Sequence, residues 1–166
     1  MNRSTDIASA LQAALAADPV ANGDHELVCL LEARGYSYPA RSATNLRLLA
    51  GIFPPENLAT ITVAALSTAM PDMALNNLER IGASIPRGEL LVACSVKNRL
   101  VQLLTICGAS PFIAGLLCRD PVHFRELFLD RQIDLKRDEA SSLASLRARI
   151  TDQTDYNELF VILRRF

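Results

Sequence analysis

The sequence is poor in aromatic side chains, has no tryptophan, and contains only two lysines among its 17 basic residues. Aromatic residues make up 5% of the 166 positions, whereas 50% of all residues are hydrophobic, so aliphatic side chains must fill the core. Charged residues reach only 21%, and this composition excludes general disorder. A chain of this length supplies one domain or two small ones.

A surplus of positive charge is also missing. Seventeen basic residues oppose 18 acidic ones, which gives a net charge of −1 and an isoelectric point near 6.1. This balance argues against a nucleic-acid-binding protein, which normally carries a basic surplus. No apolar run approaches the roughly 20 residues of a membrane span, and Asp6, Ser9 and Gln12 interrupt the apolar N-terminal stretch, so neither a membrane partner nor a signal peptide is expected. We expect a cytoplasmic protein.

Paired cysteine motifs are absent as well. The four cysteines lie in apolar contexts, and no two of them have CxxC spacing (Cys29, Cys94, Cys107 and Cys118). In an intracellular chain such residues are typically buried free thiols. The sequence therefore predicts inert thiols within the core.

The common catalytic patterns are missing too. His25 and His123 have no partner at the spacing of an HExxH site, no glycine-rich phosphate loop occurs, and no Asp-x-Asp pair is present. Asp130, Asp134 and Asp138 follow one another at intervals of four residues and could lie on one face of a helix. Basic residues lie between them, however, and this indicates a solvated surface rather than a metal site. We therefore assign no catalytic, cofactor-binding or metal-binding residue in this chain.

Helical periodicity, by contrast, is present almost throughout. Proline or a capping residue opens most segments and glycine ends several of them. Expected helices lie near 4–15, 24–34, 41–50, 54–69 and 86–108. Others begin at Pro71, Pro111 and Pro121, and apolar residues within 143–150 and 156–163 mark the last two. Alternating strand patterns and hairpin turns are not found. The sequence predicts an all-α protein of about nine to ten helices, arranged as an irregular helical bundle or a short helix-pair array.

One internal repeat bears on that choice. Five positions recur at an offset of 32 residues, Asn45, Leu46, Leu49, Pro54 and Leu58 matching Asn77, Leu78, Ile81, Pro86 and Leu90. This spacing suits a helix-pair repeat. Two similar helix–proline–helix turns in an irregular bundle explain it equally well. We expect a single helical domain over 1–166, with a candidate division at the charged stretch 129–139.

Several short motifs resemble one known family. LNNLER at 75–80, GASPFIA at 108–114 and LRRF at 163–166, with RGY at 34–36 and NLR at 45–47, resemble the N-terminal part of glutamate–ammonia-ligase adenylyltransferases, from Glu32 to Phe166. The residues of the three main motifs that carry the resemblance are Asn77, Leu78, Glu79, Arg80, Gly108, Ser110, Pro111, Phe112, Arg164, Arg165 and Phe166. Local chemistry gives them structural roles: Gly108 ends a helix, Ser110 and Pro111 begin the next, and Phe112 enters the core.

The resemblance implies a bifunctional regulator that transfers AMP to and from glutamine synthetase. Its nucleotidyltransferase domains use Mg²⁺ and ATP through a Gly-Ser-Asp-x-Asp-type motif, and no such motif occurs in this chain. We therefore expect a non-catalytic N-terminal segment, a fragment whose partners are glutamine synthetase and an adjoining nucleotidyltransferase domain. The alternative is a stand-alone helical-repeat module for protein interaction.

The last predicted helix carries an apolar stripe to the final residue. The stripe comprises Tyr156, Leu159, Phe160, Leu163 and Phe166. We expect part of it, Phe166 above all, to be exposed or covered by a neighbouring molecule. Exposure of large apolar side chains would favour weak self-association.

Overall fold

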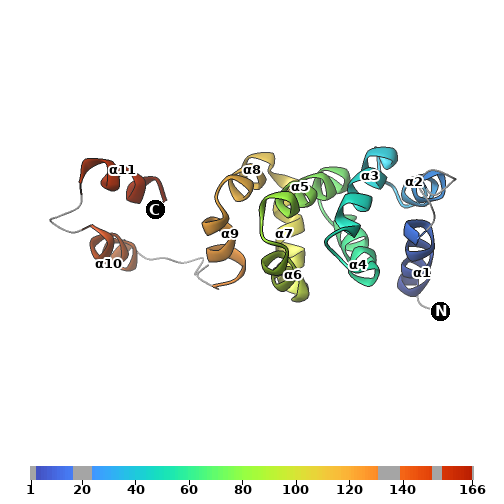
Figure 1. Cartoon of the computed structure of the whole chain (residues 1–166), viewed down its shortest axis with the longest axis horizontal. Coiled ribbons are helices and arrows are strands. Elements are labelled where there is room, and N and C mark those ends of the chain that lie inside the picture. The colour runs from blue at the N-terminus through green and yellow to red at the C-terminus, as the bar shows by residue number, and fades with distance from the viewer. Residues whose placement is uncertain (1–2, 17–23, 131–138, 151–154, 166) are drawn as a thin grey trace. The chain divides into compact units, whose positions relative to one another are not determined.

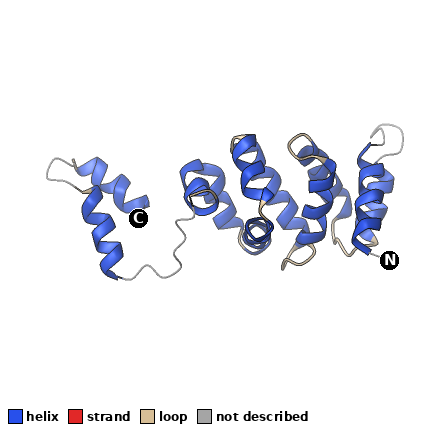
Figure 2. Ribbon diagram, turned by 90° about the horizontal axis from the view of Figure 1, so that it is seen from below, coloured by secondary structure: helices blue, strands red, loops and turns tan. Residues whose placement is uncertain are grey.

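The computed structural model of the chain describes residues 3–16, 24–130, 139–150 and 155–165. Eleven helices and no strand occur in these ranges, which confirms the all-α prediction (Figures 1 and 2). They are α1 (Arg3–Ala16), α2 (Asp24–Glu32), α3 (Pro39–Ala50), α4 (Pro55–Ala65), α5 (Pro71–Ser84), α6 (Arg87–Ser95), α7 (Lys97–Ala109), α8 (Pro111–Arg119), α9 (Pro121–Phe128), α10 (Glu139–Arg149) and α11 (Tyr156–Arg165).

The chain divides into two compact units, Met1–Asp130 and Arg131–Phe166. The first contains α1 to α9 and the second contains α10 and α11. The division falls within the charged stretch 129–139 that the sequence indicated as a candidate boundary.

The first unit is a helical array with two layers. In one layer α2, α3, α5 and α8 contact one another in succession, and in the other α1 contacts α4 and α4 contacts α7 (Figure 1). Helix α5 packs against α7 and joins the layers. Proline opens α3, α5 and α8 because its missing N–H would have no helical partner there. The starts of these three helices are therefore fixed locally by sequence.

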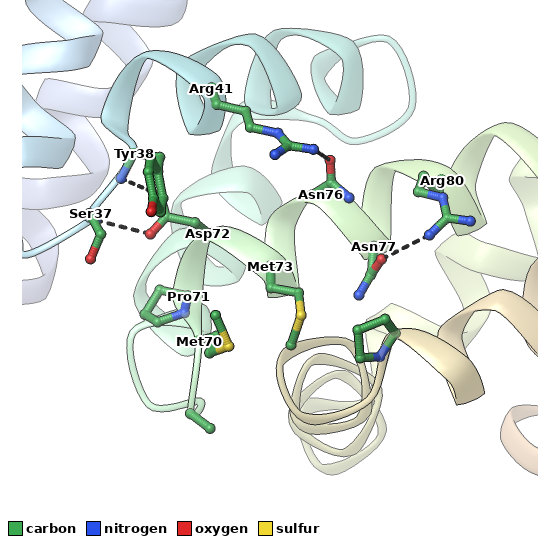
Figure 3. Close-up of a pocket in the computed structure, with 12 residues that line it drawn as sticks. Ser37, Tyr38, Arg41, Met70, Pro71, Asp72, Met73, Asn76, Asn77 and Arg80 are labelled. Carbon is green, nitrogen blue, oxygen red and sulfur yellow. Dashed lines mark hydrogen bonds between the residues drawn. The ribbon is translucent and has the colours of Figure 1, made fainter.

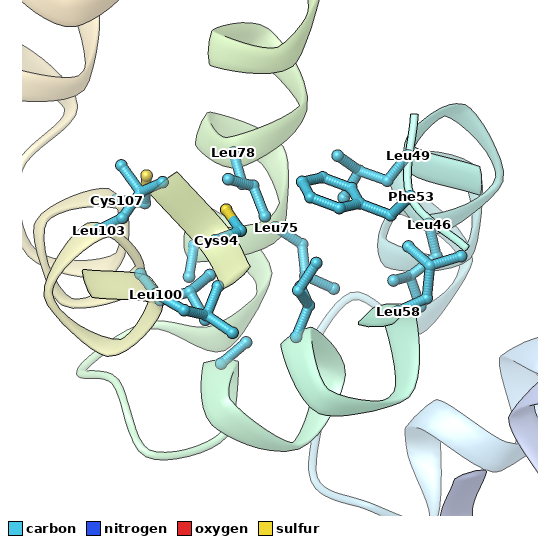
Figure 4. Packing of buried hydrophobic residues seen from close by; sticks show 14 of the residues in the cluster. Leu46, Leu49, Phe53, Leu58, Leu75, Leu78, Cys94, Leu100, Leu103 and Cys107 are labelled. Atoms are coloured by element: carbon cyan, nitrogen blue, oxygen red, sulfur yellow. The ribbon is translucent and has the colours of Figure 1, made fainter. Parts of the chain in front are cut away.

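Aliphatic side chains fill the space between the layers, as the composition predicts. Leu46, Leu75 and Leu78 have no exposed surface, and Phe53 retains only 2% (Figure 4). Four of the five matched pairs of the 32-residue repeat are buried in both copies, for example Leu49 with Ile81, and only the pair Pro54 and Pro86 is not. Equivalent residues of successive helix pairs thus serve the same core, and this favours the array over the irregular bundle.

Arg47 ties the first three helices together. Its Nε donates to Asp24 Oδ1 at 2.6 Å, and its terminal nitrogens donate to the carbonyl oxygens of Leu15 and Ala14 at 3.1 and 3.2 Å. Those carbonyls lie in the last turn of α1, where they have no partner within the helix. One side chain of α3 therefore caps α1 and pairs with the first residue of α2.

The segment expected as one helix over 86–108 is broken. Val96 is extended, with φ −98° and ψ 115°, and α6 meets α7 at a bend of 112°. Continuing the stripe of Leu90, Ala93 and Cys94 at helical spacing would place Lys97 on the buried face. The break leaves Lys97 exposed while Leu100, Leu103 and Leu104 remain buried.

Among the described residues, no single helix is long and apolar enough to cross a membrane. Helices α6 and α7 reach that length and composition only when they are taken together across their sharp bend.

In the second unit, Tyr156 and Phe160 of α11 pack edge to face with ring centroids 4.8 Å apart. Both remain more than half exposed, at 73% and 53%. Phe166, for which exposure was expected, lies outside the described residues.

Candidate functional site

Two of the motifs that carry the family resemblance meet where α5, α7 and α8 join. Asn77 of α5 is buried, and its Nδ2 donates to the carbonyl oxygen of Cys107 in α7 at 2.8 Å. Arg80, one turn further along α5, donates to Asn77 Oδ1 at 3.2 Å. Both polar ends of the Asn77 amide are thereby satisfied, as a buried amide requires.

Gly108 lies at the closest approach within this joint. A β-carbon built at position 108 would come within 2.6 Å of Thr68 Oγ1, 2.7 Å of Thr68 Cβ and 3.4 Å of Ala74 Cβ. Thr68 cannot swing away freely, because its hydroxyl donates to the carbonyl oxygen of Ala65 at 2.7 Å. Gly108 was expected to end its helix, but it lies inside α7, which continues to Ala109. Glycine is required there by close packing between α7, α5 and the turn after α4.

Ser110 begins α8. It is extended, and its Oγ accepts a hydrogen bond from the Ile113 backbone N–H at 3.2 Å, while Pro111 occupies the first helical position. The side chain thereby satisfies one of the backbone donors that a helix start leaves without a partner.

Replacing Ser110 by alanine is expected to lower the free energy of unfolding by about 1 kcal/mol, because that backbone donor loses its acceptor. Overall helicity should not change. Urea unfolding followed by circular dichroism gives the comparison, and Ser110→Asp, which keeps an acceptor at the cap, serves as the control. Equal midpoints for Ser110→Ala and the unsubstituted chain would contradict the capping role.

Phe112 was expected in the core, and this expectation is wrong. Its side chain is 73% exposed, and Ile113 and Leu116 are 40% and 37% exposed. The short helix α8 buries only the narrow face defined by Ala114 and Leu117. Phe112 lies two residues before Ala114, which places it on the opposite side of the helix.

The other motif residues are dispersed. Leu78 belongs to the core, Glu79 is partly buried beside it on α5, and Arg164 and Arg165 lie in the last turn of α11. Phe166, Asp134 and Asp138 lie outside the described residues.

A cleft of about 420 Å³ opens beside this joint, between the starts of α3, α5 and α8. Arg41 comes from α3, Asp72, Asn76 and Arg80 come from α5, and Pro111 belongs to α8 (Figure 3). Arg41 donates to Asn76 Oδ1 at 3.1 Å across the boundary between α3 and α5. Residues distant in the sequence therefore form one concave surface.

Both carboxylate oxygens of Asp72, which lines this cleft, accept hydrogen bonds from residues at the start of α3. Asp72 accepts hydrogen bonds from the backbone N–H groups of Ser37 and Tyr38, at 2.9 and 3.0 Å, and from the Ser42 hydroxyl at 2.7 Å. These donors belong to the start of α3, where the helix dipole also favours negative charge. Asp72 thus acts as a cap supplied by the neighbouring helix.

No group of three potential metal ligands occurs among the described residues. Burial raises the pKa of the Cys94 thiol to about 12 and also raises the pKa of Cys107, so both stay protonated at neutral pH. Cys29 was expected to be buried, but it is exposed because α2 buries the opposite face through Leu27 and Leu31.

The contact between Cys29 and His25 was not predicted from the sequence. Cys29 Sγ lies 3.8 Å from His25 Nε2, one helical turn away on α2. The spacing of four residues was the available signal. No third potential metal ligand groups with this pair among the described residues.

Comparison with known proteins gives one distant relationship. The chain is 31% identical over 107 residues to the bifunctional glutamine synthetase adenylyltransferase/adenylyl-removing enzyme of Thioalkalivibrio sulfidiphilus (strain HL-EbGR7). The alignment covers 62% of this chain and 11% of that enzyme, so the chain spans about a tenth of its relative's length. No family profile matches the sequence, and no solved structure matches it significantly. The chain is distantly related to this adenylyltransferase.

Proposed function

We propose that the chain is a non-catalytic helical segment of a glutamine synthetase adenylyltransferase/adenylyl-removing enzyme. In this role it holds an adjoining nucleotidyltransferase domain in position and contacts glutamine synthetase. ATP and Mg²⁺ would serve that adjoining domain. The distant identity to such an enzyme and the motifs shared with its family support the assignment.

The observation that carries the proposal is the joint between α5, α7 and α8. Asn77, Gly108 and Ser110, which belong to the family-like motifs, respectively bridge two helices, permit close packing and cap a helix. Residues that perform such tasks preserve the shape of a scaffold. The side chains of Asn77 and Ser110 both make hydrogen bonds within the chain.

The chain alone is therefore expected neither to remove AMP from glutamine synthetase nor to transfer AMP to it. Mg²⁺-dependent phosphoryl chemistry requires oxygen ligands placed around the metal, and the sequence has no Asp-x-Asp pair for that purpose. Purified chain is incubated with adenylylated synthetase, phosphate and Mg²⁺, and separately with unmodified synthetase, ATP and Mg²⁺. A full-length adenylyltransferase is the positive control. Loss of the adenylyl group from the synthetase, which leaves as ADP when phosphate is the acceptor, or incorporation of AMP, if EDTA abolishes it, would contradict the proposal.

Binding to glutamine synthetase tests the scaffold role directly. Saturable binding of the chain to immobilised bacterial glutamine synthetase is expected in biolayer interferometry. An unrelated dodecameric protein on the sensor serves as the control for non-specific adsorption. Absence of saturable binding would remove glutamine synthetase as a partner of this chain.

A second function, a stand-alone helical-repeat interaction module, is favoured by one specific observation. The pairs α3–α4 and α5–α6 repeat their proline starts, Pro39 with Pro71, as well as their buried positions, at the same offset of 32 residues. Arrays of this kind commonly present an extended binding surface. Binding of the chain to an unrelated protein, without binding to glutamine synthetase, would favour this alternative.

A further inference from the structure

The outer surface around the cleft carries large apolar side chains at three successive helix starts. Tyr38 directly precedes α3, Met70 directly precedes α5, and Phe112 is the second residue of α8. Their side chains are 68%, 55% and 73% exposed. Tyr38, Met70 and Pro111, the neighbour of Phe112, all line the cleft. We call Tyr38, Met70 and Pro111 the apolar rim, because Phe112 follows Pro111 but does not itself line the cleft.

Two arginines, Arg41 and Arg80, also line the cleft, and neither forms an ion pair among the described residues. Each guanidinium donates to an amide oxygen, that of Asn76 or Asn77. Among the described residues, ion pairs join Arg47 to Asp24 and Arg125 to Glu89. Guanidinium groups of this kind offer further donors to an incoming carboxylate.

Asp72, the acidic residue that lines the cleft, pairs with neither arginine, and its single negative charge is smaller than the two guanidinium charges. Both oxygens of Asp72 accept hydrogen bonds from the start of α3, so its carboxylate compensates the α3 dipole. The surface thus combines two available guanidinium groups with an apolar rim around a concavity. Exposed apolar area edged by charge is characteristic of protein-binding surfaces.

We propose that the cleft between α3, α5 and α8 binds an acidic segment of a partner protein, with carboxylates on Arg41 and Arg80 and apolar side chains on the rim. Charge complementarity selects carboxylates, and the apolar rim selects a polypeptide over a nucleic acid. The overall charge of −1 and isoelectric point near 6.1 are also unlike those of a nucleic-acid-binding surface. The inference does not depend on glutamine synthetase being that partner.

Because the partner is defined by its chemistry, selection from a random peptide library displayed on phage tests the proposal. Selection on the full chain is expected to enrich peptides that combine aspartate or glutamate with leucine, phenylalanine or similar residues. The affinity of the best peptide, labelled with fluorescein, is then measured by fluorescence anisotropy. Absence of enrichment, or enrichment without acidic residues, would overturn the proposal.

Charge reversal locates the binding. The double variant Arg41→Glu/Arg80→Glu is expected to weaken peptide binding about tenfold or more, and Tyr38→Ala about fivefold. Arg87→Glu is the matched control, because Arg87 is an exposed arginine at the start of α6 outside the cleft. Since Arg80 also contacts Asn77, Arg41→Glu alone is measured as a variant that leaves the buried amide undisturbed.

Each remaining outcome decides the proposal. Equal peptide affinity for the double variant and the Arg87→Glu control would place binding elsewhere and overturn the assignment. Tighter binding of a labelled single-stranded oligonucleotide than of any selected peptide, lost on charge reversal, would assign the cleft to nucleic acid instead. Failure of the synthetase-binding experiment together with success of peptide selection would remove glutamine synthetase and retain the docking cleft.

Discussion

Replacing Leu78 by alanine is expected to lower the free energy of unfolding of the first unit by about 3 kcal/mol. Leu78 has no exposed surface and lies in α5, the helix that contacts α3, α7 and α8. Removing its isobutyl group forfeits apolar burial and leaves a cavity that helices from both layers would have to move to fill. This is one of the two largest effects we expect from a single substitution.

Leu48→Ala is the matched control for this variant. Leu48 lies in α3 and is 55% exposed, so its replacement is expected to change stability by no more than roughly 0.5 kcal/mol. Urea unfolding is followed by circular dichroism, and labelling of the buried thiols Cys94 and Cys107 reports opening of the first unit specifically. Similar midpoints for Leu78→Ala and Leu48→Ala would contradict the assigned core.

The helix starts could be predicted from the sequence because they depend on neighbouring residues alone. Proline after an extended residue marks the beginnings of α5 and α8, and Gly35, with φ of 93°, follows α2 as the expected stop. Helix α3 is an exception, because it begins at Pro39, ahead of the expected start near Arg41. Helical spacing of aliphatic residues then determines which face is buried. The fold class follows from these local signals.

The helix break at Val96 and the exposure of Phe112 could not be predicted from the sequence. Both depend on which face of a helix is turned toward the neighbouring helices. The apolar stripe is continuous from Leu90 to Cys107 when only residue types are considered, yet its phase shifts at Val96 and requires a break. Phe112 is apolar like its neighbours, but α8 packs mainly against α5, α7 and α9 and buries a narrow face. Tertiary contacts decide such cases.

The cleft could not be predicted for a related reason. Arg41, Asp72 and Pro111 are separated by more than 30 residues in the sequence at each step and meet only because α3, α5 and α8 lie in succession. Sequence motifs did identify Asn77, Arg80, Gly108 and Ser110 at the adjoining joint. The contact of Gly108 with Thr68 and the hydrogen bond of Asn77 to the Cys107 carbonyl oxygen are tertiary, and no sequence motif indicates them.

Gly108→Ala is the second substitution with a large expected effect, a loss of about 2 kcal/mol in the free energy of unfolding. In an exposed helix the same change would stabilise the chain, because alanine is the better helix former. At position 108 the added carbon would meet Thr68 Cβ at 2.7 Å, well inside contact distance, so α7 would have to move away from α5. Urea unfolding measures the change.

Two further variants separate this steric effect from helix propensity. Gly115 lies in α8, and a β-carbon added there would meet nothing within 4 Å, so Gly115→Ala is expected to raise stability by roughly 0.5–1 kcal/mol. In a Thr68→Gly background, which removes both clashing atoms, Gly108→Ala is expected to lose most of its cost, because the two sites are coupled through direct contact. An unchanged cost in that background would contradict the role assigned to Gly108, and with it the close packing of the joint on which the scaffold proposal rests.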